Sequence, residues 1–187
     1  MSQPHLVSVL KRGGLAFIPT DTIYGIVARA RDRKAAMRLY TLRRRTPEKP
    51  FIILIDSVAR LRDFGVAISS SQRAFLKKVW PGKVSVILPC TAKKFSYLHL
   101  GTEALAFRVP KSKGLQALLK KTGPLVAPSA NREGGKPAET VAEAKRYFGS
   151  HVALYVHGRT TRTPSTLISL LSWTPRVIRA GAGRVGN

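Results

Sequence analysis

Residues 104–131 read ALAFRVPKSKGLQALLKKTGPLVAPSAN, and this stretch decides the fold class. Ala104 to Val109 is an apolar run with the length of a strand, and Leu115 to Lys121 is expected to form a helix. Leu125 to Pro128 is a second short apolar run, and polar residues follow it directly. A strand, a helix and a strand in succession are typical of an α/β sheet with helices packed on it.

The same alternation extends in both directions from this stretch. We expect further strands at residues 15–19, 51–55, 83–88, 152–156, 166–170 and 176–179, and further helices at 6–11, 34–42, 58–64, 71–79 and 140–148. The late strands follow one another with few helices between them, which favours a mixed sheet over a purely parallel one. Residues 91–103 are expected to form a long loop. A length of 187 residues fits one α/β domain over residues 1–187.

Charge is the unusual feature of the composition. The chain has 33 Lys and Arg against nine Asp and Glu, a formal net charge of +24. Such an excess costs self-repulsion in the folded state and is typical of proteins with a polyanionic partner. We therefore expect contact with nucleic acid, and the alternative is a solvated basic surface.

The rest of the composition describes a folded protein of the cytosol. Apolar residues make up 44% of the chain, enough for a real core, yet they form no run long enough to span a membrane. Met1 to Lys11 lacks the pattern of a signal peptide. The single cysteine, Cys90, excludes an internal disulfide and a cysteine-rich zinc site. We expect no membrane association and a cytoplasmic location.

Four polar segments stand at the ends of predicted strands, where α/β sheets bind their ligands. The first, PTDTIYG at residues 19–25, offers hydroxyls and backbone amides to a small polar substrate; the alternative is a Thr/Asp helix cap with a turn. Another, APSAN at 127–131, places Ser129 and Asn131 two residues apart, on the same side if the strand continues. A hydroxyl and a carboxamide together suit a ribose, a base edge or an α-amino acid, and the alternative is an Asx turn.

The other two segments are basic. RRRTPEKP at residues 43–50 combines arginines and a lysine, which suit phosphate oxygens, with two prolines that stiffen the chain. Its alternative is a solvated basic loop, because residues 29–45 already hold eight Lys or Arg against one Asp. The last segment pairs Ser165 with the strand that ends at Arg179. Arg179 and the glycine-bearing turn after it suit a nucleotide, and the alternative is an edge strand with a surface arginine.

Several common site motifs are missing from the sequence. It has neither a GxxxxGK[ST] loop nor a GxGxxG turn, so any use of ATP would not follow the usual phosphate-binding motifs. The four histidines lack the spacing of metal ligands, and no pair of carboxylates suggests acid/base hydrolysis. With nine carboxylates in all, we expect no dedicated protein metal site, and Mg²⁺ would be carried by phosphates.

Seven segments, taken in order, resemble the YrdC/TsaC family of threonylcarbamoyl-AMP synthases. They are PTDTIYG, YTLRRRTPEKP, WPGKVSVILP, LAFRVP, APSAN, PSTLI and VIRAG, and the similarity extends from about residue 6 to 181. The resemblance implies a twisted open sheet with flanking helices and a positively charged concave face that binds ATP and threonine. It also implies synthesis of threonylcarbamoyl-AMP and pyrophosphate from ATP, L-threonine and bicarbonate, with proteins that transfer the threonylcarbamoyl group to tRNA as downstream partners.

The resemblance also assigns roles to individual residues. For the threonine substrate it implies Thr22, Arg108, Ser129 and Ser165. For the nucleotide it implies Arg45, Lys49, Asn131, Thr140 and Arg179. It makes Arg43, Arg45 and Lys49 the catalytic cations.

Two departures from the family pattern concern this site. Arg43 stands where the family usually has lysine, which keeps the charge but excludes any role for a neutral amine. Ala104 stands where many relatives have a hydroxyl residue.

Two alternatives to the synthesis of threonylcarbamoyl-AMP remain. One is an RNA-binding module that uses the basic face on tRNA or double-stranded RNA without catalysis. The other is a different carbamoyl-adenylate chemistry, because similar domains occur inside larger carbamoyl-transfer enzymes.

Overall fold

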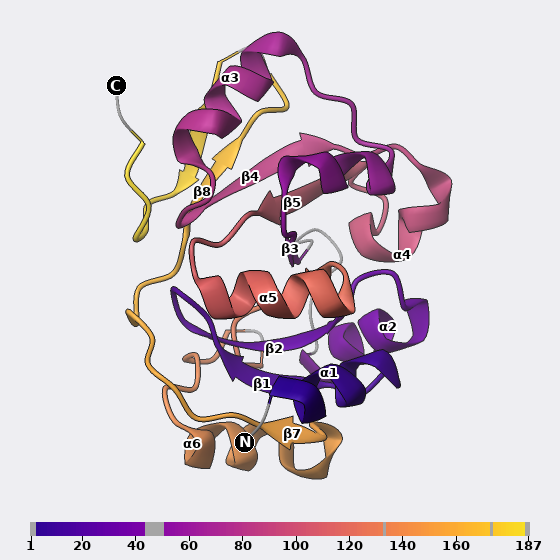
Figure 1. Cartoon of the computed structure of the whole chain (residues 1–187), viewed down its shortest axis with the longest axis vertical. Helices are drawn as coiled ribbons and strands as arrows, with labels where there is room; N and C mark the ends of the chain where they lie inside the picture. The colour runs from indigo at the N-terminus through magenta and orange to yellow at the C-terminus, as the bar shows by residue number, and fades with distance from the viewer. Residues whose placement is uncertain (1–2, 44–50, 133, 173, 186–187) are drawn as a thin grey trace.

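The computed structural model describes residues 3–43, 51–132, 134–172 and 174–185, and Figure 1 shows their arrangement. The helices in these ranges are α1 (Gln3–Lys11), α2 (Arg33–Arg43), α3 (Ser70–Val79), α4 (Ser96–His99), α5 (Lys113–Thr122) and α6 (Val141–Phe148), with the 3-10 helices η1 (Val58–Phe64), η2 (Lys93–Phe95) and η3 (Gly149–His151). The strands are β1 (Ala16–Pro19), β2 (Tyr24–Arg29), β3 (Ile52–Leu54), β4 (Val84–Pro89), β5 (Ala104–Arg108), β6 (Leu125–Val126), β7 (Leu154–Tyr155), β8 (Thr166–Ser169) and β9 (Arg176–Arg179). None of the helices in these ranges combines the length and apolar character needed to cross a membrane.

All the described strands belong to one mixed sheet, with the order β7-β1-β2-β6-β3-β5-β4-β8-β9. Parallel pairing joins β1 to β7, β3 to β5 and β4 to β8. The other neighbours are antiparallel, among them the β1–β2 hairpin with Ala16 opposite Val27. The sheet ends at β7 and β9 without closing, so the prediction of an open mixed sheet with flanking helices is confirmed.

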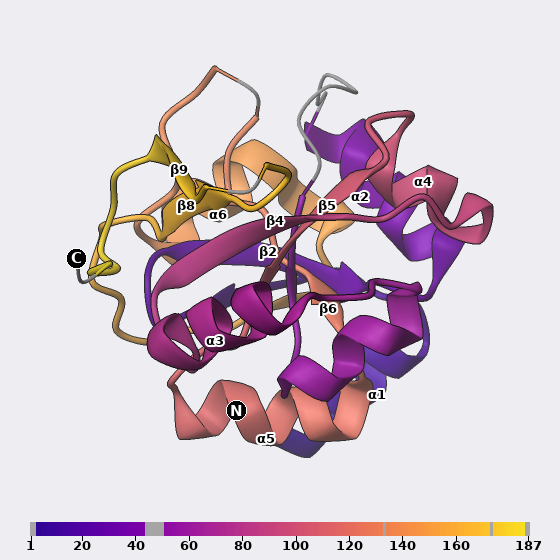
Figure 2. The same ribbon diagram turned by 90° about the horizontal axis from the view of Figure 1, so that it is seen from above.

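Helices cover the sheet because successive strand residues point to opposite faces. Val27 of β2 packs in one apolar cluster with Leu10 of α1 and Leu118 of α5. Its neighbour Ile26 belongs to a second cluster, which includes Phe148 of α6. Figure 2, a view from above, shows α1 and α5 on one side of the sheet and α6 on the other. The inner strands are therefore buried on both faces, as their continuous apolar runs require, whereas the edge strand β9 is exposed along its length.

The structure differs from the sequence-based expectation in two segments. Strand β2 was not predicted, because its first residues lie inside the polar segment 19–25. Gly25 lets this strand run close to the chain after β6, since a Cβ atom there would lie 3.1 Å from the carbonyl oxygen of Pro128. The prediction of a loop over residues 91–103 is wrong, because η2 and α4 occupy it. Phe95 and Leu98 of this segment are buried and anchor it to the core.

Candidate active site

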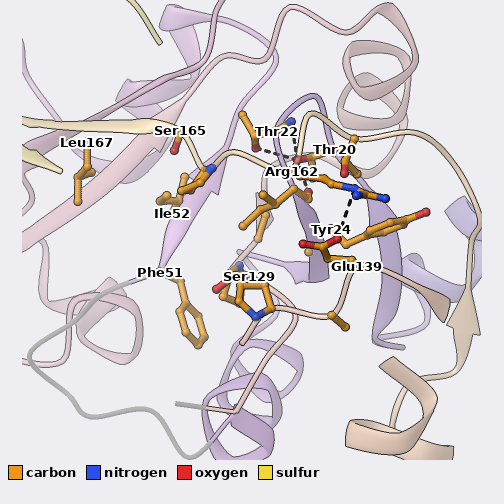
Figure 3. Close-up of a pocket in the computed structure, with 18 of the residues that line it drawn as sticks. Thr20, Thr22, Tyr24, Phe51, Ile52, Ser129, Glu139, Arg162, Ser165 and Leu167 are labelled. Carbon is orange, nitrogen blue, oxygen red and sulfur yellow. Dashed lines mark hydrogen bonds and ion pairs between the residues drawn. The ribbon is translucent and has the colours of Figure 1, made fainter. Parts of the chain in front are cut away.

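A cavity of about 1030 Å³ lies beside the sheet and joins segments that are far apart in the sequence. Its apolar surface comes from the strand residues Ile52, Ile87, Ala106, Leu167 and Ile178. Its polar surface comes from the β1–β2 turn, the segment after β6, helix α6 and the link between β7 and β8. Figure 3 shows side chains from these segments around the cavity, among them Thr22, Ser129 and Ser165.

The turn between β1 and β2 fixes the hydroxyl of Thr22. The Oγ1 atom of Thr20 donates to the carbonyl of Ile23 over 2.6 Å and accepts the amide of Thr22 over 3.2 Å. The two threonine hydroxyls lie 3.0 Å apart. Thr20 and Thr22 are buried and both line the cavity. The segment is thus a hairpin turn and not a helix cap, and its hydrogen bonds hold Thr22 at the cavity surface.

Arg108 at the end of β5 is a buried cation with a fixed direction. Its Nη1 atom lies 2.6 Å from a carboxylate oxygen of Asp21, and Nη2 donates to the hydroxyl of Thr22 over 3.4 Å. The other carboxylate oxygen of Asp21 accepts the amide of Lys111 over 3.2 Å. Burial lowers the pKa of Arg108, and the charge of Asp21 opposes that shift. Among the described residues Arg108 Nε has no hydrogen-bond partner, so this cation retains a donor.

Arg43, the last residue of α2, lies outside the cavity lining and forms hydrogen bonds with the segment 129–131. Its side chain is 1% exposed, and its Nε atom donates to the backbone carbonyl of Asn131 over 2.7 Å. Its Nη2 atom donates to the Oδ1 atom of Asn131 over 2.8 Å and to the hydroxyl of Ser129 over 3.3 Å. The Nδ2 atom of Asn131 is bound to the carbonyls of Arg132 and Gly135. Of these three predicted site residues, only Ser129 lines the cavity.

Ser165 and Arg179 form the opposite wall. The hydroxyls of Ser165 and Ser85 lie 2.8 Å apart, which links the start of β8 to β4. Arg179 of β9 donates from Nη2 to the carbonyl of Ser165 over 2.8 Å. Both predicted residues line the cavity, and a register shift between β8 and β9 lies next to Arg179, at Leu167 and Ile168.

The remaining predicted residues lie elsewhere. Thr140 is the N-cap of α6, where its hydroxyl accepts the amide of Glu143 over 3.1 Å, and it does not line the cavity. Arg45 and Lys49 lie outside the described residues. The roles of all these residues in binding stay predictions, whereas the meeting of Thr22, Arg108, Ser129, Ser165 and Arg179 at one cavity is a structural fact.

The sequence did not point to several side chains that line the same cavity. Among them are Lys136, Glu139, Arg146 and Arg162. A helical spacing gave one usable signal, because Glu143, Arg146 and Tyr147 of α6 lie three and four residues apart and share a face. No such signal marks Arg162, whose position depends on the path of an irregular link.

Comparison with known proteins agrees with this arrangement over nearly the whole chain. The family model Sua5_yciO_yrdC, described as telomere recombination, matches residues 8–181. Threonylcarbamoyl-AMP synthase of Thiobacillus denitrificans is 37% identical over 182 residues, which are 96% of this chain and 95% of that protein. Threonylcarbamoyl-AMP synthase of Bacillus subtilis is 31% identical over 93% of this chain, which spans only 51% of that longer relative.

One solved structure of similar shape is a complex with an amino acid. It is the crystal structure of P. abyssi Sua5 complexed with L-threonine, which is 27% identical and matches with a TM-score of 0.87. The match covers 96% of this chain and 54% of that one. The extent of the sequence match and the shared architecture lead to one conclusion: this chain belongs to the Sua5/YciO/YrdC family.

Proposed function

We propose that this protein is a threonylcarbamoyl-AMP synthase, which makes threonylcarbamoyl-AMP and pyrophosphate from ATP, L-threonine and bicarbonate. One observation carries the proposal. Thr22, Arg108, Ser129, Ser165 and Arg179 meet at a single cavity in a chain that is 37% identical to an enzyme of that name, over 95% of its length.

The threonine substrate is expected to lie against Thr22, Arg108, Ser129 and Ser165. An α-amino acid presents a carboxylate, for which a buried guanidinium is a suitable partner. Arg108 is held by Asp21 at 2.6 Å, so its direction is set before a substrate arrives. The hydroxyls of Thr22, Ser129 and Ser165 supply donors and acceptors for the remaining polar atoms of the substrate.

The proposed reaction has two steps, and the protein assists it by binding the substrates close together and reducing the repulsion between their negative charges. The amine of threonine captures bicarbonate to form a carbamate and water. A carbamate oxygen then attacks the α-phosphorus of ATP, the bond from that phosphorus to the bridging oxygen breaks, and pyrophosphate leaves. The main obstacle is repulsion between the carbamate, the carboxylate and the triphosphate. Fixed cations at the cavity reduce it, and no covalent intermediate with the protein is needed.

We propose that the protein supplies no dedicated magnesium site. The described residues contain no group of three or more His, Cys, Asp or Glu side chains that could hold a metal ion. The cavity carboxylates are already engaged, Glu139 with Arg162 over 3.3 Å and Glu143 with the amide of Glu139 over 2.8 Å. We propose that Mg²⁺ enters with the phosphates of ATP.

Product analysis tests the proposal directly. The purified protein is incubated with ATP, L-threonine and bicarbonate, pyrophosphate is measured, and the adenylate is identified by mass spectrometry. We expect pyrophosphate only when all three substrates are present. Pyrophosphate release without threonine would indicate another carbamoyl-adenylate chemistry. An absence of turnover together with RNA binding would favour the non-enzymatic alternative.

A second proposal concerns tRNA, and the net charge of +24 favours it. Basic side chains gather around Tyr97, where β2 leads into α2. The guanidinium of Arg33 lies 5.8 Å from the centre of the Tyr97 ring. Burial raises the pKa of Tyr97, and the charges of Arg31 and Arg33 oppose that rise. None of these side chains lines the cavity. We propose that this surface binds tRNA in the cytoplasm, near the proteins that transfer the threonylcarbamoyl group.

Salt titration separates RNA binding from catalysis. Each phosphate that a cation neutralises changes the slope of log affinity against log salt by about one unit. Neutralising Arg29, Arg31 and Arg33 together is expected to flatten the slope and leave adenylate synthesis intact. A matched control neutralises Arg73, Lys77 and Lys78, which are exposed on α3. A wild type that does not bind tRNA at low salt, or equal effects of both triple variants, would contradict this proposal.

A further inference from the structure

Arg162 has a backbone conformation that few non-glycine residues adopt. It lies in the link between β7 and β8 with φ 58°, in the left-handed region. The link is fixed on both sides of it. The amide and the hydroxyl of Thr161 donate to the carbonyl of Thr22 over 2.8 and 3.1 Å, and the carbonyl of Pro164 accepts the amide of Ala182 over 2.8 Å. Arg162 is therefore held in this conformation by its neighbours.

The ion pair of Arg162 does not compensate for that conformation. Its Nε atom lies 3.3 Å from a carboxylate oxygen of Glu139, and the two side chains are 74% and 53% exposed. An exposed pair of this kind contributes about 0.2–1 kcal/mol, whereas a non-glycine residue in the left-handed region costs on the order of 1–3 kcal/mol. Local stability thus gives no reason for an arginine at this position.

The location of the ion pair at the cavity gives a functional reason for an arginine at position 162. Arg162 and Glu139 both line the cavity, at the side where the β7–β8 link faces the segment before α6, and Figure 3 shows the contact between them. Among the described lining residues are five cations, Arg108, Lys136, Arg146, Arg162 and Arg179, and two acids, Glu139 and Glu143.

Other charges at the cavity are held more firmly. Buried Arg108 is bound to Asp21 over 2.6 Å, and Arg179 donates to the carbonyl of Ser165. Glu143 accepts the amide of Glu139 over 2.8 Å. The partner of Arg162 is by contrast an exposed carboxylate on a separate segment, and an incoming anion can replace it at little cost.

We infer that Arg162 is a substrate-binding residue whose guanidinium exchanges Glu139 for an oxyanion of the bound substrate. The oxyanion is a phosphate of ATP or the carboxylate of threonine, the two anionic groups that the proposed reaction brings to this cavity. The inference rests on the proposed function for the identity of these ligands. Glu139 holds the guanidinium in place until substrate binds and competes with the substrate for it.

Binding measurements on three variants test the inference. Arg162→Gly removes the guanidinium and suits the left-handed backbone, so its thermal midpoint is expected to stay near that of the wild type. Its affinity for one ligand is expected to fall about tenfold, the loss of one charge-assisted contact. Arg162→Lys is expected to restore part of that loss. Glu139→Gln frees Arg162 and is expected to raise the same affinity up to about fivefold.

Calorimetry with tripolyphosphate and with L-threonine, each measured separately on the intact protein, identifies the ligand. A change in the tripolyphosphate titration assigns Arg162 to ATP, and a change in the threonine titration assigns it to the amino acid. Unchanged affinity for both ligands in Arg162→Gly overturns the inference, as does weaker binding in Glu139→Gln. If the wild type makes threonylcarbamoyl-AMP and Arg162→Gly binds both ligands normally, the inference fails and the proposed function stands. If the wild type makes no adenylate but the titrations shift as expected, the proposed function fails and the binding role of Arg162 stands.

Discussion

Replacing Arg43 with alanine is expected to damage the active site through the protein interior. Arg43 does not line the cavity, and its side chain is 1% exposed. It donates to both oxygens of Asn131 and to the hydroxyl of Ser129. The variant leaves these acceptors without their charged donor, and Ser129 keeps its hydrogen bond of 2.7 Å to Oδ1 of Asn131 but loses the contact with Arg43.

The size of the effect follows from these contacts. A buried acceptor that loses its donor costs about 1–3 kcal/mol, and Arg43→Ala removes the donor from three neutral acceptors. We therefore expect Arg43→Ala to lower the free energy of unfolding by about 3–5 kcal/mol, a large part of the roughly 5–15 kcal/mol of a typical domain. Arg43→Lys keeps the charge but lacks the planar fork, so we expect a loss of about 1–2 kcal/mol and substantial remaining turnover.

Urea unfolding and pyrophosphate release measure the two consequences on the same samples. Arg38→Ala is the matched control, because Arg38 is exposed on the same helix. Stability and turnover are expected to fall together in Arg43→Ala and to stay near wild type in Arg38→Ala. If Arg43→Ala loses turnover at unchanged stability, the guanidinium acts on the substrate itself and the positioning role is refuted. A loss in Arg43→Lys greater than in Arg43→Ala would show that the fork has a role beyond its charge.

Three further predictions concern other parts of the chain. Arg45→Ala and Lys49→Ala are each expected to lower pyrophosphate release tenfold or more (about 1.5–3 kcal/mol per charged contact) with the fold intact, and normal turnover in both would remove them from the site. Asp21→Asn releases Arg108 from its ion pair, so the KM for threonine is expected to rise about tenfold while that for ATP changes less; an equal change in both would contradict a threonine-specific role. The Cys90 thiol is buried, so iodoacetamide is expected to label it only after unfolding. Burial also raises the pKa of this thiol above its ordinary value of 9.0, so the free energy of unfolding is expected to fall as the pH rises through that value. Rapid labelling of the folded protein would show that the thiol is accessible.

The sequence predicted the strand–helix–strand unit of residues 104–131 because its apolar runs are long and clearly separated. It did not predict β2, since Tyr24 begins this strand within a polar motif and the strand depends on pairing with β1 and β6. It also did not predict α4, where the burial of Leu98 outweighs weak local signals. Elements that are stabilised by distant neighbours are the ones that local patterns miss.

For the candidate site, strand ends were the reliable guide. Thr22 and Ser129 follow predicted strands, Arg108 lies at the end of one and Ser165 directly precedes another. The sheet brings all four to one cavity. Arg43 is different, because it begins a run of three arginines and nothing in that run shows that its side chain is buried. Its spacing of four residues from buried Leu39 was a signal that sequence reasoning did not use.

The link between β7 and β8 has almost no slack. In sheet order β7 is the first strand and β8 the eighth, so seven spacings of about 4.8 Å separate them, roughly 34 Å across a flat sheet. Residues 156–165 span this width, and Figure 1 shows them running along one side of the molecule. Ten residues reach about 33–36 Å when fully extended, and the chain bends at Arg162, so the link fits only because the twist of the sheet brings its ends closer together. Loop length here is consequently constrained in one direction: added residues would only loosen the crossing, whereas removing two would force the ends of the sheet together or break their pairing.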